Sequence, residues 1–148
     1  GRDRAISRGY VSDLSFCVVD AEQIPLPDRC MDRVTISFGL RNCTDKLAVL
    51  KEARRVLKPG GRFLCLEFSR VQVAALAPIY DAWSFKVLPA MGSLIAKDRD
   101  SYQYFAESIR MFPDQETLAD MFREAGFSHV RYQSLSGGIA AIHSGWRL

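Results

Sequence analysis

The chain has 148 residues, of which 48% are hydrophobic and 25% are charged, and its formal net charge is +3. This composition is typical of a globular domain, and the length suffices for one core. The small charge gives no indication of nucleic-acid binding. No stretch approaches the roughly 20 apolar residues needed to span a bilayer, and no amino-terminal segment resembles a signal peptide.

Two apolar segments in the first third of the chain, residues 14–19 and 34–38, predict β-strands. The polar residues beyond their ends include Asp20 after the first strand and Arg41 and Asn42 after the second. Open α/β sheets bind ligands at the carboxyl ends of their strands. The sequence therefore predicts a ligand site where these ends meet.

Residues 55–69, RVLKPGGRFLCLEFS, join a helix end, a tight turn and a buried strand. The helix is predicted by apolar residues at helical spacing after Thr44 and Asp45, either of which can cap its amino terminus. Proline cannot continue the helix, and the two glycines that follow tolerate a chain reversal. Residues 63–68 predict a third strand, which delivers further polar groups to the same edge.

The last third of the chain predicts two helices and then a hairpin. Their signals are Asp100 or Ser101 as the first cap, Pro113 and Asp114 at the second start, and Gly126 at its end. Residues 129–135 and 138–143 read as strands joined by a Ser-Gly-Gly turn. No repeat or linker indicates a second domain.

The cysteines and histidines give no metal or disulfide pattern. Cys17, Cys30, Cys43 and Cys65 include no C-x-x-C pair and have no histidine at zinc-ligand spacing. Two of them lie in predicted strands, so buried thiols in a reducing compartment are expected, with a disulfide or a catalytic thiol as the alternative. A structural role is expected for His129 and His143.

Four blocks of the chain resemble, in order and spacing, the UbiE/COQ5 family of S-adenosylmethionine-dependent C-methyltransferases of ubiquinone and menaquinone biosynthesis. They are Asp20-Ala21-Glu22 with Pro25, the block SFGLRN at 37–42, residues 55–69, and the tail GGIAAIHSGW. The resemblance covers essentially the whole chain. It implies one partial α/β domain over residues 1–148, a Rossmann-like class I methyltransferase sheet that ends in an antiparallel strand.

Two features that the resemblance leads one to expect have no counterpart in the chain. They are the glycine-rich loop after the first strand and the acidic residue that ends the second. The chain thus resembles strands three to seven of the fold, whose sheet order is 3-2-1-4-5-7-6. The strand at 14–19 would then lack its only neighbour, and the strand at 34–38 would present an open edge. We expect such a chain to fold poorly alone and to aggregate.

The resemblance implies S-adenosylmethionine as the cofactor, with Asp20 and the backbone of Ala21 holding the adenine and Ser37 as a further contact. For Asp20 the alternative is a carboxylate that only forms a turn. No metal site is implied.

The resemblance also makes Arg41 and Asn42 the expected catalytic residues. Methylation of a quinol ring carbon is easier once a phenolic proton is lost. A guanidinium is a poor base, but it can stabilise the phenolate or orient a water that takes the proton, while Asn42 supplies directed hydrogen bonds. The alternative for Arg41 is a surface salt bridge, for example with Asp45.

A polyprenylated quinol substrate requires an apolar cover, and seven of the sixteen aromatic residues lie within residues 80–112. Tyr80, Asp81 and Ser84 are the expected polar contacts to the substrate ring. Ordinary helix packing, a homodimer contact and peripheral membrane association are the alternatives for this aromatic span.

Two other classes of function remain open at the level of sequence. One is a noncatalytic protein that binds other quinone-biosynthesis enzymes through the aromatic span. The other is the dinucleotide-binding domain of an oxidoreductase, which lacks support because no glycine fingerprint is present. The resemblance permits a bacterial cytoplasmic or membrane-associated enzyme and equally a peripheral protein of the mitochondrial inner membrane on its matrix face. It does not separate ubiquinone from menaquinone precursors.

Overall fold

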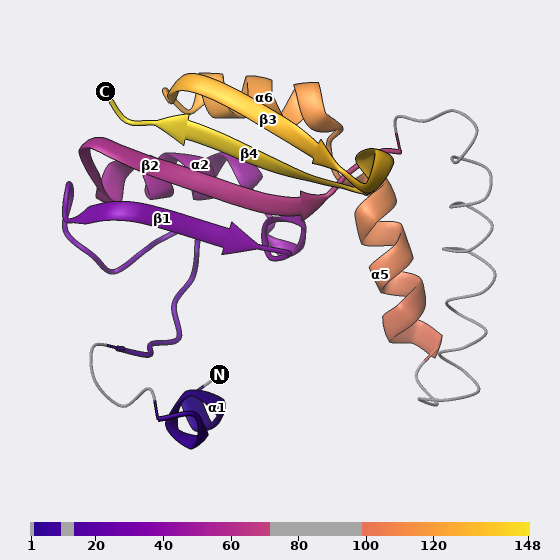
Figure 1. Cartoon of the computed structure of the whole chain (residues 1–148), viewed down its shortest axis with the longest axis horizontal. Coiled ribbons are helices and arrows are strands. Elements are labelled where there is room, and N and C mark those ends of the chain that lie inside the picture. The colour runs from indigo at the N-terminus through magenta and orange to yellow at the C-terminus, as the bar shows by residue number, and fades with distance from the viewer. Residues whose placement is uncertain (1, 10–13, 72–98) are drawn as a thin grey trace.

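The computed structural model describes residues 2–9, 14–71 and 99–148 (Figure 1). Their centre is a mixed four-stranded sheet in the order β1-β2-β4-β3. Strands β1 (Met31–Ser37) and β2 (Leu57–Phe68) are parallel, β4 (Ala140–Trp146) runs antiparallel to β2, and β3 (Ser128–Leu135) runs antiparallel to β4. This is the order expected for strands 4, 5, 7 and 6, so the predicted hairpin and the predicted open edge at β1 are confirmed.

Two helices cover one face of the sheet, α2 (Lys46–Val56) and α6 (Gln115–Glu124). Asp45 caps α2 by accepting a hydrogen bond from the amide of Ala48 at 3.0 Å, and Asp114 caps α6 through the amide of Thr117. Both capping predictions are confirmed, because the signal for a cap lies within a few residues of the helix that it starts.

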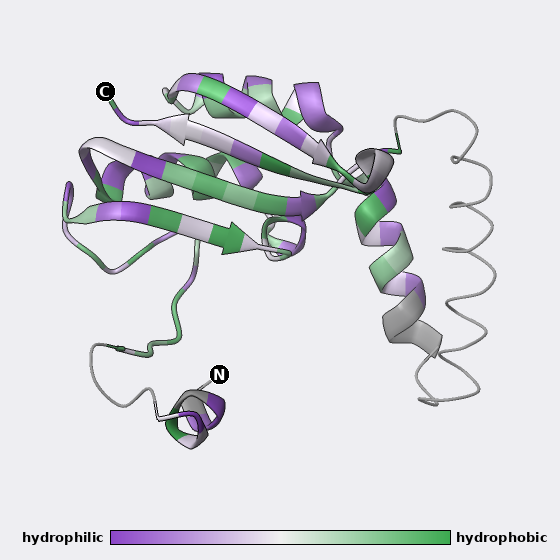
Figure 2. Cartoon of the chain, in the orientation of Figure 1, coloured by the Kyte–Doolittle hydropathy of each residue, from purple (hydrophilic) through white to green (hydrophobic). Residues whose placement is uncertain are grey.

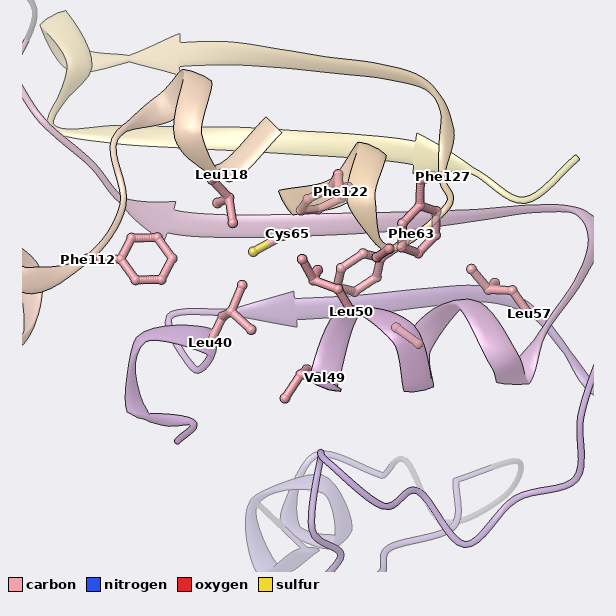
Figure 3. Close-up of a cluster of buried hydrophobic side chains, with 12 residues drawn as sticks. Leu40, Val49, Leu50, Leu57, Phe63, Cys65, Phe112, Leu118, Phe122 and Phe127 are labelled. Atoms are coloured by element: carbon pink, nitrogen blue, oxygen red, sulfur yellow. The ribbon is translucent and has the colours of Figure 1, made fainter. Parts of the chain in front are cut away.

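The core lies between these helices and β2 (Figure 3). Phe63 on β2 stacks on Phe122 of α6 and on Phe127, with ring centroids 5.3 and 5.6 Å apart. Leu50 of α2 and Leu118 of α6 complete the contact between the two helices. Burial of this cluster fixes the helices on β2 and thereby fixes the loops at the carboxyl end of the strand.

The predicted glycine turn lies near the start of β2, where the strand carries a large bulge. Met31 of β1 pairs with Leu57, and Arg33 pairs with Arg62, so the intervening residues of β2 leave the ladder. Gly60 has φ of +80°, and a Cβ on Gly61 would lie 2.8 Å from the carbonyl oxygen of Lys58. The glycines at this turn are therefore required by the backbone, as predicted.

The helix α5 (Arg99–Met111) stands beyond the carboxyl ends of β1 and β2 (Figure 1). Asp100 and Ser101 lie in its first turn, so the prediction that one of them precedes the helix as its cap is wrong. A short helix α1 (Arg2–Ser7) precedes the sheet. No helix in the described ranges is long and apolar enough to cross a membrane.

The predicted strand at residues 14–19 does not form. These residues are coil, although much of the segment is hydrophobic (Figure 2), and Val18 is fully exposed. Leu14, Phe16 and Cys17 are also exposed, so the expectation of a buried Cys17 is wrong as well. The physical reason is that a strand needs a neighbour, and β1 is the edge of the described sheet with no strand beyond it.

Candidate functional site

The carboxyl ends of β1 and β2 form one edge of the sheet, which we call the rim: Ser37 to Asn42 with Glu67 to Ser69. Ser37 pairs with Leu66 at the end of the parallel ladder, and the amide of Phe38 donates to the carbonyl of Leu66 at 2.9 Å. Phe38 then adopts φ of +53°, which ends β1 one residue earlier than predicted. The chain turns there into the 3-10 helix η1 (Leu40–Asn42).

Arg41 lies in η1 and is nine-tenths buried, with 10% of its side chain exposed. Its Nη1 donates to the carbonyl of Phe38 at 2.5 Å and forms an ion pair with Glu67, 3.2 Å from Oε2. The alternative of a surface salt bridge to Asp45 is wrong, since the Asp45 carboxylate caps α2 instead. The structure thus places the predicted catalytic arginine in a buried ion pair at the rim.

The guanidinium of Arg41 is also flanked by aromatic rings. Its Cζ lies 5.4 Å from the ring centroids of both Phe68 on β2 and Phe105 on α5. The two rings meet edge to face at 5.3 Å, and Phe38 packs on Phe68 at 4.6 Å. Cation–π contacts of this kind are stronger where water is excluded, so the rings restrict both the position and the solvation of Arg41.

Asn42, the second predicted catalytic residue, is contacted by α5, the helix that also carries Phe105. Its Oδ1 accepts a hydrogen bond from the hydroxyl of Tyr104 on α5 at 3.2 Å. Neighbouring residues of α5, Tyr104 and Phe105, therefore contact neighbouring residues of η1.

Within the aromatic span, residues 80–112, only some side chains are described. Of these, Phe112 is a core residue, which is the helix-packing role given above as an alternative for the span.

Asp20 and Ala21 lie in a turn rather than at a strand end. Oδ1 of Asp20 accepts the amide of Glu22 at 2.9 Å, which is the local turn offered as the alternative for this residue. Ala21 is half-buried against the core. The turn is tied to the start of α2 by Glu22, whose Oε1 accepts a hydrogen bond from the amide of Asp45.

The loop that follows Ala21 is fixed on α2. Oε2 of Glu52 accepts the amide of Ile24 at 2.9 Å, and Arg55 donates to the carbonyls of Ile24 and Leu26. The hydrogen bonds and ion pair that link Glu52 with Arg55 lower the pKa of Glu52. These contacts give the loop a definite position without a strand before it.

Two of the cysteines, Cys43 and Cys65, have surroundings that disfavour the thiolate needed for nucleophilic catalysis. Cys43 follows η1, and burial together with Glu22 raises the pKa of its thiol, with smaller contributions from Asp20 and Glu67 and an opposing one from Lys46. Burial also raises the pKa of Cys65, and all four cysteines are free.

Both histidines lie in the last two strands, as predicted. His143 on β4 is buried, and its Nε2 is 2.8 Å from the carbonyl oxygen of Gln115. Burial lowers its pKa, and this fits the expected structural role. Among the residues that the structure describes, no three His, Cys, Asp or Glu side chains are placed to hold a metal ion.

Comparison with known proteins gives the family. The model of the ubiE/COQ5 methyltransferase family matches residues 1–147. The chain belongs to the ubiE/COQ5 methyltransferase family. It is 68% identical over 148 residues to the ubiquinone/menaquinone biosynthesis C-methyltransferase UbiE of Acidiphilium cryptum and 57% identical over 143 residues to that of Caulobacter vibrioides. These matches cover 100% and 97% of the chain but only 59% and 57% of the relatives.

Solved structures show that this family member has a class I methyltransferase fold. A SAM-dependent methyltransferase of Aquifex aeolicus matches 99% of the chain and 61% of its own, with a TM-score of 0.66 and 14% identity. The cyclase SpnF matches 99% of the chain and 60% of its own, with a TM-score of 0.69 and 17% identity. At such identities the likeness establishes the fold alone, and the predicted fold class is confirmed.

For this ubiE/COQ5 chain, the structure brings together Ser37, Arg41 and Asn42 on one edge. Tyr80, Asp81 and Ser84 lie outside the described residues. Sequence reasoning missed the parts played by Glu67, Tyr104 and Phe105. A signal for Glu67 existed: Phe63, Cys65 and Glu67 alternate along β2 on the buried face, and a carboxylate on a buried face requires a partner.

Proposed function

We propose that this protein is an S-adenosylmethionine-dependent C-methyltransferase that methylates the ring of a polyprenylated quinol in ubiquinone or menaquinone biosynthesis. The observation that carries the proposal is the 68% identity, along the whole chain, to the UbiE of Acidiphilium cryptum. The chain spans about three fifths of that relative, so the activity is proposed for the chain extended at its amino terminus to the relative's length, called here the extended protein.

The turn at Asp20 fits the adenine half of the cofactor. Asp20 is exposed, and one of its carboxylate oxygens is fixed by the amide of Glu22, so the other can accept from an exocyclic amino group. Ala21 supplies the neighbouring backbone, and Ser37 lies at the end of β1. We assign these three residues to cofactor binding. When bound, S-adenosylmethionine supplies a methyl group on an electron-poor sulfonium.

Arg41 is assigned to the ring oxygen of the substrate. Its Nη1 is engaged with Phe38 and Glu67, and its Nε is buried without a hydrogen-bond partner among the described residues. An acceptor presented to the Nε side would satisfy that donor, and a phenolate oxygen is such an acceptor. Negative charge on this oxygen enriches the ring carbon that is methylated, so stabilising it accelerates the reaction.

Asn42 and the rings around Arg41 complete the proposed site. The amide nitrogen of Asn42 is a donor toward a second ring substituent, while its oxygen is fixed by Tyr104. Phe68 and Phe105 exclude water from the guanidinium. Holding the ring carbon and the methyl group at attack distance supplies much of the remaining acceleration.

The substrate's hydrocarbon chain is proposed to lie against the aromatic span, with Tyr80, Asp81 and Ser84 as ring contacts. The curated relatives reported above are bacterial, and this favours the bacterial location over the mitochondrial one. Peripheral contact with the membrane, where such a substrate dissolves, is part of the proposal, and so is a homodimer or a complex with other quinone-biosynthesis enzymes.

The test is methyl transfer by the extended protein from isotopically labelled S-adenosylmethionine to a demethylated quinol, followed by mass spectrometry. Arg41→Lys keeps the charge and loses the planar fork, and we expect kcat to fall about 100-fold or more. Arg123→Lys, in an exposed ion pair on α6, is the matched control and should leave kcat unchanged. Absence of transfer by the unaltered protein would contradict the proposal.

A further inference from the structure

Glu67 is the carboxylate of the rim, and only 1% of its side chain is exposed. It accepts hydrogen bonds from the backbone amide of Arg41 at 3.2 Å, from Arg41 Nη1, and from the amide of Phe68 at 3.1 Å. Every one of these donors belongs to the rim. Its hydrogen bonds therefore connect η1 to the end of β2, whereas a carboxylate in a purely electrostatic pair would contact the guanidinium alone.

We infer that Glu67 is the positioning residue of the reaction: it holds Arg41 by Nη1 so that the Nε side of the guanidinium is presented to the ring oxygen of the substrate. This inference rests on the proposed function, because it assigns Glu67 a role that acts through Arg41. Glu67 itself has no contact with the substrate in this assignment.

The orientation follows from the donors of a planar guanidinium. A guanidinium has five N–H donors in a fixed fork, and the Nη1 end of Arg41 is used by Phe38 and Glu67. The opposite side carries Nε, which is buried and has no partner in the described part of the chain. A buried donor left unpaired is unfavourable, so the structure contains a donor for which it supplies no acceptor.

Two aromatic contacts and a backbone hydrogen bond prevent Arg41 from turning this donor elsewhere. Phe68 and Phe105 each lie 5.4 Å from its Cζ, on different elements of the fold. Glu67 also fixes the backbone of Arg41, so neither the main chain nor the side chain is free to rotate. Donors that are oriented before the substrate arrives require no rearrangement during the reaction, which is the condition for strong electrostatic stabilisation.

The test uses the extended protein with Glu67→Gln, which keeps the volume of the side chain and removes its charge and one acceptor. We expect kcat to fall about 100-fold, the effect of a misplacement of roughly 1 Å, with the Kd for S-adenosylmethionine within about twofold of the unaltered value. Glu116→Gln, which removes the same charge from an exposed pair on α6, is the matched control and should leave both quantities unchanged.

The double variant Arg41→Lys with Glu67→Gln separates positioning from a merely structural role. If Glu67 acts through Arg41, the double variant has the kcat of Arg41→Lys alone, because there is no oriented fork left to lose. If the two reductions multiply, Glu67 acts independently of Arg41 and the inference is wrong. The same conclusion follows if Glu67→Gln retains full kcat.

Glu67→Asp is a second variant that keeps the inference testable if Glu67→Gln does not fold. It keeps the charge but withdraws the carboxylate by one methylene, and we expect a lowered kcat with a normal cofactor Kd. If neither Glu67 variant folds, Glu67 is a stability residue and the inference is overturned. If the unaltered extended protein transfers no methyl group, the proposed function fails; if it does and Glu67→Gln equals it, the inference alone fails.

Discussion

Residues 34–38, which lead into the rim, and residues 14–19 have the same kind of sequence, an apolar run followed by polar residues. Only the first of these two segments contributes a strand to the sheet. At the rim, β1 pairs with β2, and this pairing brings Arg41 against Glu67. Residues 14–19 have no described strand beside them, and their apolar side chains are exposed. The difference shows that a strand signal is realised only where a neighbour exists to pair with it.

The largest effect is expected where the rim is broken. Arg41→Ala leaves the carboxylate of Glu67 buried without its cationic partner, with two backbone amides as its remaining donors among the described residues, so we expect the free energy of unfolding to fall by about 3–5 kcal/mol. Urea denaturation of the extended protein measures this. Arg123→Ala removes an exposed pair and should change the value by about 0.5 kcal/mol or less; equal losses for the two variants would show that the rim pair is not buried in solution.

Local signals explain what the sequence predicted correctly. The caps Asp45 and Asp114 and the glycine turn at 60–61 depend on a few adjacent residues, and they were predicted. The strand at 14–19 was predicted wrongly because pairing is not a local property. The bond between Tyr104 and Asn42 joins residues 62 apart in the chain, and no spacing rule contains it.

Glu67 is an intermediate case between these two. Alternation along β2 places it on the buried face, so its need for a partner is readable from the sequence. The choice of Arg41 depends on the register of β1 against β2, which sets Ser37 opposite Leu66. Candidate residues at strand ends were therefore predictable, whereas their mutual contacts were not.

An effect of similar size is expected at residues 14–19 when a neighbouring strand is supplied. Phe16 is exposed in this chain, so Phe16→Ala should alter its stability by about 0.5 kcal/mol or less. In the extended protein, where residues 14–19 are expected to gain a paired strand, the same change should cost about 3–5 kcal/mol. Urea denaturation of both proteins measures the two values, and a negligible cost in the extended protein would contradict the expected pairing.

The smallest effect concerns the pH dependence of stability, which we assign to His143 on β4 beneath α6. Burial lowers the pKa of His143, so the unfolded chain binds a proton more readily than the folded one. The stabilisation is complete above the pKa of an unfolded histidine, about 6.5, and is lost as the pH falls below that value. His143→Gln should remove this part of the dependence between pH 5 and 8.

His129 provides the control for this measurement because it lies on β3 and is exposed. Urea midpoints of His129→Gln should follow the pH dependence of the unaltered protein. If His129→Gln flattens the curve and His143→Gln does not, the assignment of the pH effect to the buried histidine is wrong.

Calorimetric titration of S-adenosylmethionine into this chain and into the extended protein tests most directly whether the chain carries part of a methyltransferase cofactor site. We expect binding by the extended protein and little or none by the chain, because Asp20, Ala21 and Ser37 supply only part of the cofactor site. Equal binding by the two would contradict the assignment of the remaining contacts to preceding residues. Binding by neither would contradict the methyltransferase itself and favour a noncatalytic interaction protein.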